Sequence, residues 1–303
     1  FFVYWWRVLT EHWAPMWTNM EPQRILGMID LAQAMGKPTW VRQAIRWVDR
    51  IVYRGFYRDG MWHEATPSYA LMVTNRLPRL IDRLQGYTDP VGYVDPVEGN
   101  RIENLDAQSR WGAFSALAGK AVDSLILPNS RYLAINDSHS TQQGPKPSKS
   151  VPSLLPAAGI ATLGSGEGKD QFQLHLTFTS PDGHEHLDAL GVVLWAHGTE
   201  LLSDGEYHGN RPWQSSTAAH NTVVVDEKNQ FNRFQGHQVS IDWGKGTGST
   251  DDWQNYHASN GNRTELMLYD VKTPGIMVAK AAADALYPAE VSRYERLVVA
   301  VER

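Results

Sequence analysis

The 303-residue chain contains no cysteine, which excludes a disulfide framework and metal sites built from thiolates. It also contains no uninterrupted apolar run of about 18 residues, the length that a membrane-spanning helix needs. Charged residues make up 20% of the chain and hydrophobic residues 42%. This composition is that of a globular protein with a sizeable core rather than that of a disordered or membrane protein.

Positive and negative charges are unevenly distributed along the chain. The whole sequence carries a formal charge of −5, but residues 1–158 lean basic and the remainder leans acidic. A basic-leaning half fits contact with an anionic ligand, although uneven surface charge without a function explains the same pattern. The chain begins with Phe1 rather than Met, and residues 297–303 look like a strand cut short, so we interpret it as a piece of a longer protein.

Residues 1–127 are predicted to be helical. Apolar residues at helical spacing predict helices over 21–36 and 38–55, and further helices are expected over 68–84 and 107–127. Paired helices joined by short turns are typical of a solenoid or a toroid of helical hairpins. Four arginines recur every fourth residue in the second helix, from Arg42 to Arg54; a solvated face is the usual explanation, and a stripe lining an anion site is the alternative.

The pattern changes after this helical region. Residues 128–158 are rich in proline, serine, glutamine and lysine, and we interpret them as a linker or long loop. Residues 159–303 show short alternating runs; in 171–178, for example, Phe172, Leu174 and Leu176 share one face. This last region is predicted to be an all-β domain of antiparallel sheets, most simply a sandwich.

Histidine and acidic residues gather in glycine-rich turns between residues 181 and 226. His184 and His186 lie two residues apart, so in an extended segment both point to one side; Asp204 and His220 follow, each next to a strand-like run (189–196 and 222–226). Imidazoles with one carboxylate are a ligand set that zinc favours. Ordinary hydrogen-bonded histidines in turns are the plainer explanation for each residue taken singly.

The same letters permit another interpretation. His-x-His-x-Asp also opens the metal motif of metallo-β-lactamase-type hydrolases, but that motif continues with histidine where this chain has Ala189. Those proteins also need helices between their strands, and residues 159–303 show no convincing helical pattern.

Several segments together resemble the heparinase II/III-like polysaccharide lyases, over roughly residues 20–235. They are a helical first region, Glu64-Ala65-Thr66-Pro67-Ser68-Tyr69, Gly183-His184-Glu185-His186-Leu187-Asp188, Asp204-Gly205-Glu206-Tyr207, and His220-Asn221-Thr222 with Trp213 before it. The resemblance implies a partial (α/α) toroid of helical hairpins followed by an antiparallel β-sandwich, with the active site between them.

The resemblance also implies roles for individual residues. The family cleaves uronic-acid-containing polysaccharides by β-elimination, which requires a base, an acid for the leaving oxygen and neutralisation of the uronate carboxylate. Tyr69 matches the tyrosine that protonates the leaving oxygen, and His184 matches the catalytic histidine that acts as base. Tyr207 is expected to line the cleft as a further catalytic residue. His186, Asp204 and His220 match the residues that hold a structural zinc.

One part of the family's site has no secure match. The family neutralises the substrate carboxylate with an asparagine or histidine from an earlier helix, and Asn19 and His12 are the residues in that region. If such a group is absent, a non-catalytic glycan-binding protein on the same scaffold becomes the better interpretation. A toroid glycoside hydrolase is the other competitor; it would need paired carboxylic acids, and Glu64 has no evident partner in the sequence.

We therefore expect a lyase whose partner is an acidic polysaccharide, such as a glycosaminoglycan, alginate or an ulvan-like polymer. No nucleic-acid partner and no membrane span are expected, and the sequence leaves homo-oligomer formation open. Because polymers of this size are met outside the cytoplasm, the expected location is periplasmic or secreted.

Overall fold

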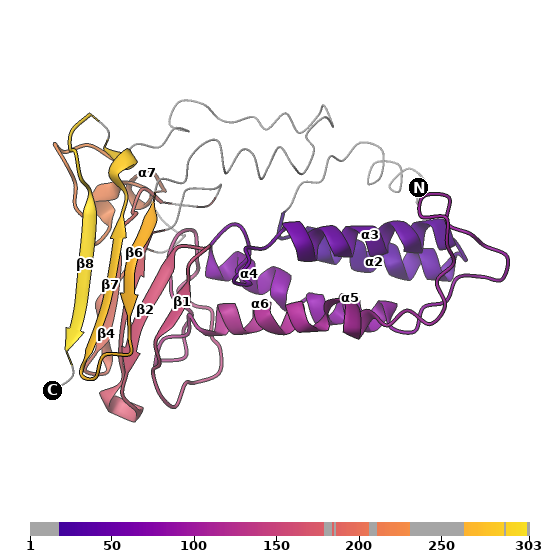
Figure 1. Ribbon diagram of the computed structural model, residues 1–303, viewed down its shortest axis with the longest axis horizontal. Helices are drawn as coiled ribbons and strands as arrows, with labels where there is room; N and C mark the ends of the chain where they lie inside the picture. The colour runs from indigo at the N-terminus through magenta and orange to yellow at the C-terminus, as the bar shows by residue number, and fades with distance from the viewer. Residues whose placement is uncertain are drawn as a thin grey trace.

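The computed structural model describes residues 18–178, 184, 186–205, 211–230, 264–287 and 289–301. Figure 1 shows a bundle of helices at one end of the molecule and two antiparallel sheets at the other. The helices are α2 (Glu21–Ala34), α3 (Pro38–Arg54), α4 (Pro67–Thr74), α5 (Leu77–Leu84), the π-helix η1 (Gln108–Gly112) and α6 (Ala113–Asp123).

The long helices form where the apolar spacing predicts them. α2 and α3 each carry proline in the first turn, where no intrahelical donor is lost. The expected helix over 68–84 is divided into α4 and α5 around Asn75 and Arg76. Pro78 explains the break, because it lacks an N–H and its ring would clash with the carbonyl of Thr74 in a continuous helix.

The arginine stripe of α3 is solvated at Arg50 and Arg54, as its spacing favours, but it is buried at Arg42. Arg42 is fully buried, and its guanidinium contacts Asp89, Asp95, Glu98 and the side chain of Asn100. The connection between α5 and η1 folds across α3 and brings these oxygens to it. The prediction of a solvated stripe is therefore wrong at Arg42, where the acidic partners lie 47 or more residues away in the chain.

The sheets contain eight strands in the described residues. The first sheet has the order β1-β2-β3-β4-β5 and the second the order β6-β7-β8, and all neighbouring strands are antiparallel. The strands are β1 (Ser153–Leu155), β2 (Ile160–Ser165), β3 (Phe172–Thr177), β4 (Val192–Ala196), β5 (Thr199–Leu202), β6 (Glu265–Asp270), β7 (Ile276–Ala282) and β8 (Glu295–Val301). Short helical turns occur as α7 (Arg211–Gln214), η2 (Gly168–Asp170), η3 (Thr217–Ala219) and η4 (Asp284–Leu286).

Each face of the first sheet contributes to a different hydrophobic core. Leu163 and Leu176 pack with Ala279 and other residues of the second sheet. Val193 and Trp195 instead belong to the core that the helices form. The alternation predicted for residues 171–178 is confirmed, because Leu174, Leu176 and Phe178 all pack on the side of the second sheet.

The fold class predicted from the sequence, a partial (α/α) toroid followed by an antiparallel β-sandwich, is therefore confirmed. One strand prediction within it is wrong. Residues 222–226 contribute a single isolated bridge, between Val225 and Lys228, instead of a strand. Asp226 and Glu227 adopt positive φ values of 51° and 57°, and these turn the chain back before a strand can extend.

Residues 128–158, expected to form a linker or long loop, are tied closely to both parts of the molecule. Residues 132–138 are buried, and β1 lies within the segment. Asp59, in the turn after α3, accepts hydrogen bonds from the backbone N–H groups of Ala157 and Ala158 at 2.8 and 3.0 Å. The helices are thus fastened to the first sheet through this segment.

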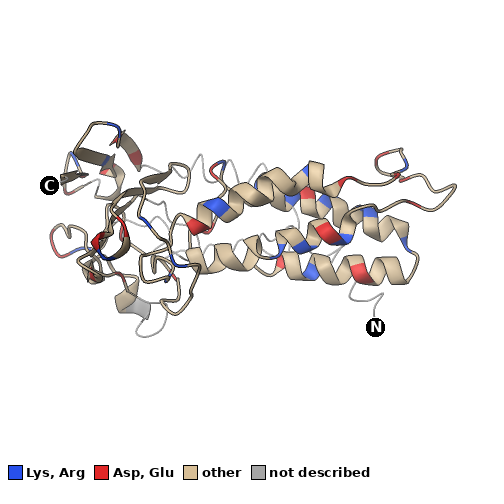
Figure 2. Ribbon diagram, turned by 90° about the horizontal axis from the view of Figure 1, so that it is seen from below, with Lys and Arg blue, Asp and Glu red and all other residues tan. Residues whose placement is uncertain are grey.

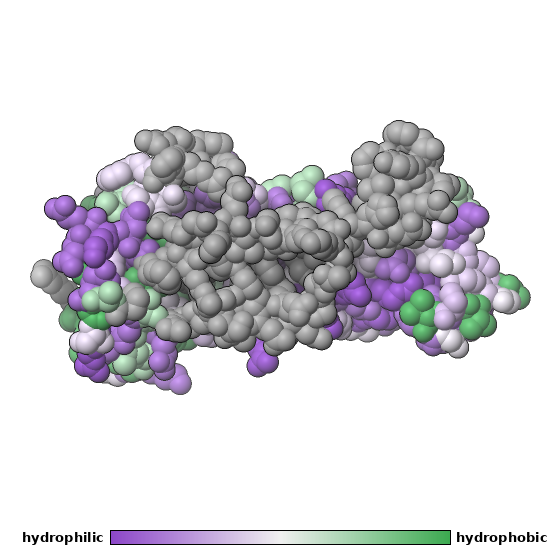
Figure 3. Space-filling model, turned by 90° about the horizontal axis from the view of Figure 1, so that it is seen from above, coloured by the Kyte–Doolittle hydropathy of each residue, from purple (hydrophilic) through white to green (hydrophobic). Residues whose placement is uncertain are grey.

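The helices carry side chains of both charges. Lysine, arginine and acidic residues alternate along the helices in Figure 2. Viewed from above, the coloured surface is mostly hydrophilic, with small separate apolar spots (Figure 3). Among the helices described, none combines the length and apolarity that crossing a membrane requires.

Candidate active site and metal centre

Tyr69 and His184 lie face to face where the helices meet the sandwich. Tyr69 is in the first turn of α4, which begins at Pro67. Just before this helix, the Thr66 hydroxyl donates to the carbonyl of Glu64 at 2.7 Å. The half-buried phenol ring stacks on the imidazole of His184, with centroids 4.1 Å apart and planes inclined by 22°. Two residues separated by more than a hundred positions are thus brought into contact.

Two carboxylates flank the His184 ring. Asp137 Oδ2 lies 3.0 Å from Nδ1, and Glu64 Oε1 lies 3.7 Å from Nε2. Glu64 is held in place by the indole N–H of Trp62, which donates to its other oxygen at 2.7 Å. Positive charge on the ring would therefore be stabilised from both sides.

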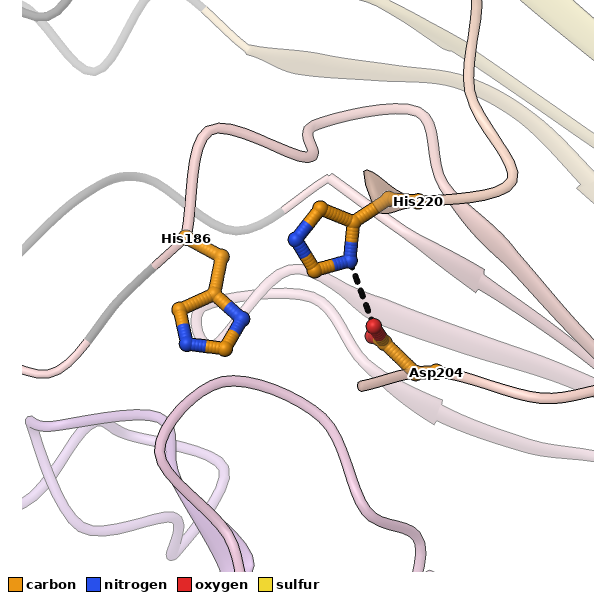
Figure 4. Close-up of side chains that lie close together, drawn as sticks. All are labelled: His186, Asp204 and His220. Carbon is orange, nitrogen blue, oxygen red and sulfur yellow. Dashed lines mark hydrogen bonds and ion pairs between the residues drawn. The ribbon is translucent and has the colours of Figure 1, made fainter. Parts of the chain in front are cut away.

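His186, Asp204 and His220 form a second cluster. One ligand atom from each lies within 4.8 Å of those of the other two. Figure 4 shows the side chains converging from separate loops: His186 precedes β4, Asp204 follows β5, and His220 follows η3. His220 Nδ1 lies 2.5 Å from Asp204 Oδ1, and its Nε2 donates to the carbonyl of Gln214 at 2.6 Å.

The cluster fits a divalent cation for reasons of burial and charge. His186 Nδ1 and Asp188 Oδ1 are buried without a hydrogen-bond partner. Burial and the neighbouring charge of Asp204 raise the pKa of Asp188. Within the described part of the chain, His220 alone forms an ion pair with Asp188 or Asp204. Two buried carboxylates whose negative charge is balanced by a single imidazole favour a bound cation. A set of two imidazoles and one carboxylate suits zinc.

The electrostatics of His220 reflect the same surroundings. Burial by itself lowers the pKa of this imidazole, but the hydrogen bond to Asp204 and the charges of Asp188 and Asp204 raise it to about 9. A metal-free cluster thus holds a proton between His220 and Asp204 near neutral pH. Metal binding must release that proton.

The His-Asn-Thr segment holds the loops around the metal cluster together. The Asn221 amide donates to the carbonyls of Val192 and Ser203, and the Thr222 hydroxyl donates to the carbonyl of Ala189 at 2.9 Å. Arg296 of β8 donates to the carbonyls of Leu190 and Asn221. The segment therefore fixes the start of β4 and the end of β5, and with them the positions of Asp204 and His220.

Not every residue singled out in the sequence is part of these clusters. Tyr207 and His12 lie outside the described residues. Asn19 donates to the sulfur of Met72, one turn beyond Tyr69 in α4. Sequence reasoning missed Asp137 altogether and left Glu64 without a partner, although both contact His184. Asp137 carries no local signal, because its partners lie 47 and 49 residues away.

Comparison with known proteins supports the resemblance seen in the motifs. Residues 147–265 match the family model described as heparinase II/III-like, C-terminal. An 82-residue stretch is 34% identical to an exo-oligoalginate lyase of Saccharophagus degradans, covering 22% of this chain and 11% of that protein.

Solved structures match over most of the chain. The heparan sulfate lyase HepC from Pedobacter heparinus superposes with a TM-score of 0.65 at 17% identity, covering 93% of this chain and 43% of that one. A structure of heparinase III gives the same TM-score at 13% identity, covering 93% and 45%. The chain thus spans less than half the length of each of these relatives.

The fold and the family model define a chain of the toroid-plus-sandwich class. Residues 147–265 match the family model of the heparinase II/III-like C-terminal region, and the resemblance to the heparinase II/III-like family is confirmed.

Proposed function

We propose that this chain forms the catalytic junction of a polysaccharide lyase that cleaves an acidic, uronate-bearing polysaccharide by β-elimination. The observation that carries the proposal is the stacking of Tyr69 on His184 between the helices and the sandwich. This stack brings a phenol and an imidazole into contact, and these are the acid and the base that the elimination needs.

The proposed roles follow from the chemistry of each group. β-Elimination removes the proton from the carbon next to the uronate carboxylate, and electrons then expel the glycosidic oxygen from the adjacent carbon. His184 takes the proton, and the carboxylates of Asp137 and Glu64 stabilise the charge that its ring acquires. The Tyr69 hydroxyl donates its proton to the departing oxygen. Tyr207 is proposed to line the cleft.

We also propose zinc as the resident metal, held by His186, Asp204 and His220. Zinc there would order the loops that carry His184 and would take no part in the bond changes. Two observations support this assignment: the three side chains are of types that bind zinc, and the buried His186 Nδ1 has no hydrogen-bond partner.

The substrate class is proposed from the relatives and from the reaction together. The relatives' names refer to heparan sulfate and to oligoalginate, both of which contain uronic acids. A panel of glycosaminoglycans, alginate and ulvan therefore covers the candidates. A periplasmic or secreted location follows from the size of such substrates and is proposed with them.

The test is to incubate the full-length protein with this panel and to follow the ultraviolet absorbance of the conjugated double bond that elimination creates. A rise with one polymer supports the lyase and identifies its substrate class. New reducing ends without absorbance would instead support a hydrolase, for which Glu64 and Asp137 on either side of His184 are the carboxylates to test. Binding without cleavage of any polymer would support a glycan-binding protein.

A further inference from the structure

We propose that Asp137 is a positioning residue that couples the metal centre to the catalytic base, by fixing the ring tautomers of His184 and His186 at the same time. The inference rests on the proposed function for the role of His184 and on the proposed zinc for that of His186.

A single buried carboxylate contacts both imidazoles. Asp137 Oδ2 lies 3.0 Å from His184 Nδ1, and its Oδ1 lies 3.2 Å from His186 Nε2. The Asp137 side chain is 3% exposed and that of His186 is 1% exposed. Water therefore competes little for these hydrogen bonds, and an ionised carboxylate can only accept them.

The backbone around Asp137 strengthens the same connection. The Asp137 N–H donates to the carbonyl of His184 at 2.9 Å. The neighbouring Asn136 is buried with a positive φ of 55°, and its amide donates to the carbonyl of Ala65 at 3.1 Å. The backbone N–H of His139 donates to the hydroxyl of Ser68, next to Tyr69. The segment 136–139 thus joins the start of α4 to the histidine loop.

The carboxylate imposes opposite tautomers on two histidines only two residues apart. Because Asp137 accepts from each ring, His184 must carry its hydrogen on Nδ1 and His186 must carry its hydrogen on Nε2. His184 is then left with Nε2 for a substrate proton. His186 is left with Nδ1, the buried nitrogen that lacks a hydrogen-bond partner, for the metal.

An Asp137→Asn substitution separates this role from a purely structural one. Asparagine keeps the shape of aspartate but offers one acceptor oxygen and one donor nitrogen. It can satisfy one of the two ring N–H groups, and the other ring must then turn its hydrogen to the opposite nitrogen. Either His184 would then carry its hydrogen on Nε2, or His186 would carry its hydrogen on Nδ1.

The experiment uses the full-length protein labelled with ¹⁵N-histidine and compares wild type, Asp137→Asn and Glu64→Gln. Ring-nitrogen NMR reads the tautomers without any polysaccharide, and competition with a chelator reads the zinc affinity. Wild type should show Nδ1–H at His184 and Nε2–H at His186. In Asp137→Asn at least one of the two tautomers should change, and if His186 changes the zinc affinity should fall by about 10–100-fold.

Glu64→Gln is the matched control, because Glu64 lies beside His184 but has no contact with the metal cluster among those described. It should leave the zinc affinity unchanged. In the turnover assay, Asp137→Asn should lower kcat with little change in KM, because it disturbs the base rather than the glycan contacts.

The proposal is overturned if the wild-type tautomers differ from those stated, or if Asp137→Asn leaves both tautomers unchanged. The wild-type spectrum decides the matter even if the variant fails to fold. Because neither NMR nor chelator competition involves a polysaccharide, failure of the lyase assay alone would overturn the proposed function and not this one.

Discussion

The ring of Tyr69 stacks on the ring of His184 at a centroid distance of 4.1 Å, although the two residues come from a helix start and from a loop of the sandwich. The stack brings a phenol, which can donate a proton, into contact with an imidazole, which can accept one. A reaction that takes a proton from one carbon and gives one to the oxygen on its neighbour needs that arrangement.

Tyr69→Phe is expected to lower lyase turnover by about 10²–10⁴-fold, the usual contribution of a positioned acid. The stack itself should persist, because phenylalanine retains the ring, and so should glycan binding and stability. Absorbance assays measure turnover, and thermal unfolding measures stability. Tyr53→Phe, at an exposed tyrosine of α3, is the control and should behave as wild type. Substantial turnover in Tyr69→Phe would remove Tyr69 from its role.

His220→Ala is expected to release stoichiometric zinc and to lower the unfolding temperature. A metal that binds only the folded chain contributes about 2.7 kcal/mol when its free concentration is a hundredfold above Kd. Elemental analysis and calorimetry with and without chelator measure the loss. His197→Asn, at an exposed histidine with a positive φ that asparagine tolerates, should retain the metal. Wild-type protein without stoichiometric metal would contradict the assignment.

The stability of the protein is expected to fall between pH 6.5 and 4 because of His175. Burial lowers the pKa of this imidazole from 6.5 to about 4, so the folded chain keeps it neutral while the unfolded chain takes up a proton. Stability from this group is fully present above pH 6.5 and is lost as the pH falls, by about 3 kcal/mol in total.

Denaturant unfolding at several pH values, with His175→Gln beside wild type, measures this effect. The His175 ring contacts the Thr162 hydroxyl at 2.9 Å and the side-chain oxygen (Oε1) of Gln173 at 3.2 Å, and glutamine can retain polar contacts there. The variant should show the shallower pH dependence over this range. Equal slopes for both proteins would assign the acid sensitivity to other groups.

Arg42→Met is expected to cost about 3–5 kcal/mol of unfolding free energy, because it leaves the buried carboxylates of Asp89 and Asp95 without their main counterion. Urea unfolding measures the change. Arg83→Ala is the comparison, because its ion pair with Asp30 is more than half exposed and should contribute less than about 1 kcal/mol. Similar losses in the two variants would contradict this account of the cluster.

The sequence predicts what depends on local spacing. The helical region, the alternation along β3 and the meeting of His186, Asp204 and His220 all follow from short patterns or from motif resemblance. The roles of these site residues stay predictions. What depends on distant partners was not predictable: nothing near Asp137 or Arg42 in the chain indicates that either is buried against groups about fifty residues away.

The first sheet has consequences for how such a chain can be divided or recombined. Because alternate residues of β2 and β4 face the helical core and the second sheet, the described part of the first sheet offers no solvent-facing layer at which to separate the two halves. A helical half taken alone would lose Ile160, Val193 and Trp195, which belong to the same hydrophobic core as Leu125 and Leu127. We therefore expect a recombined chain to fold only when its helices and its first sheet come from the same parent protein.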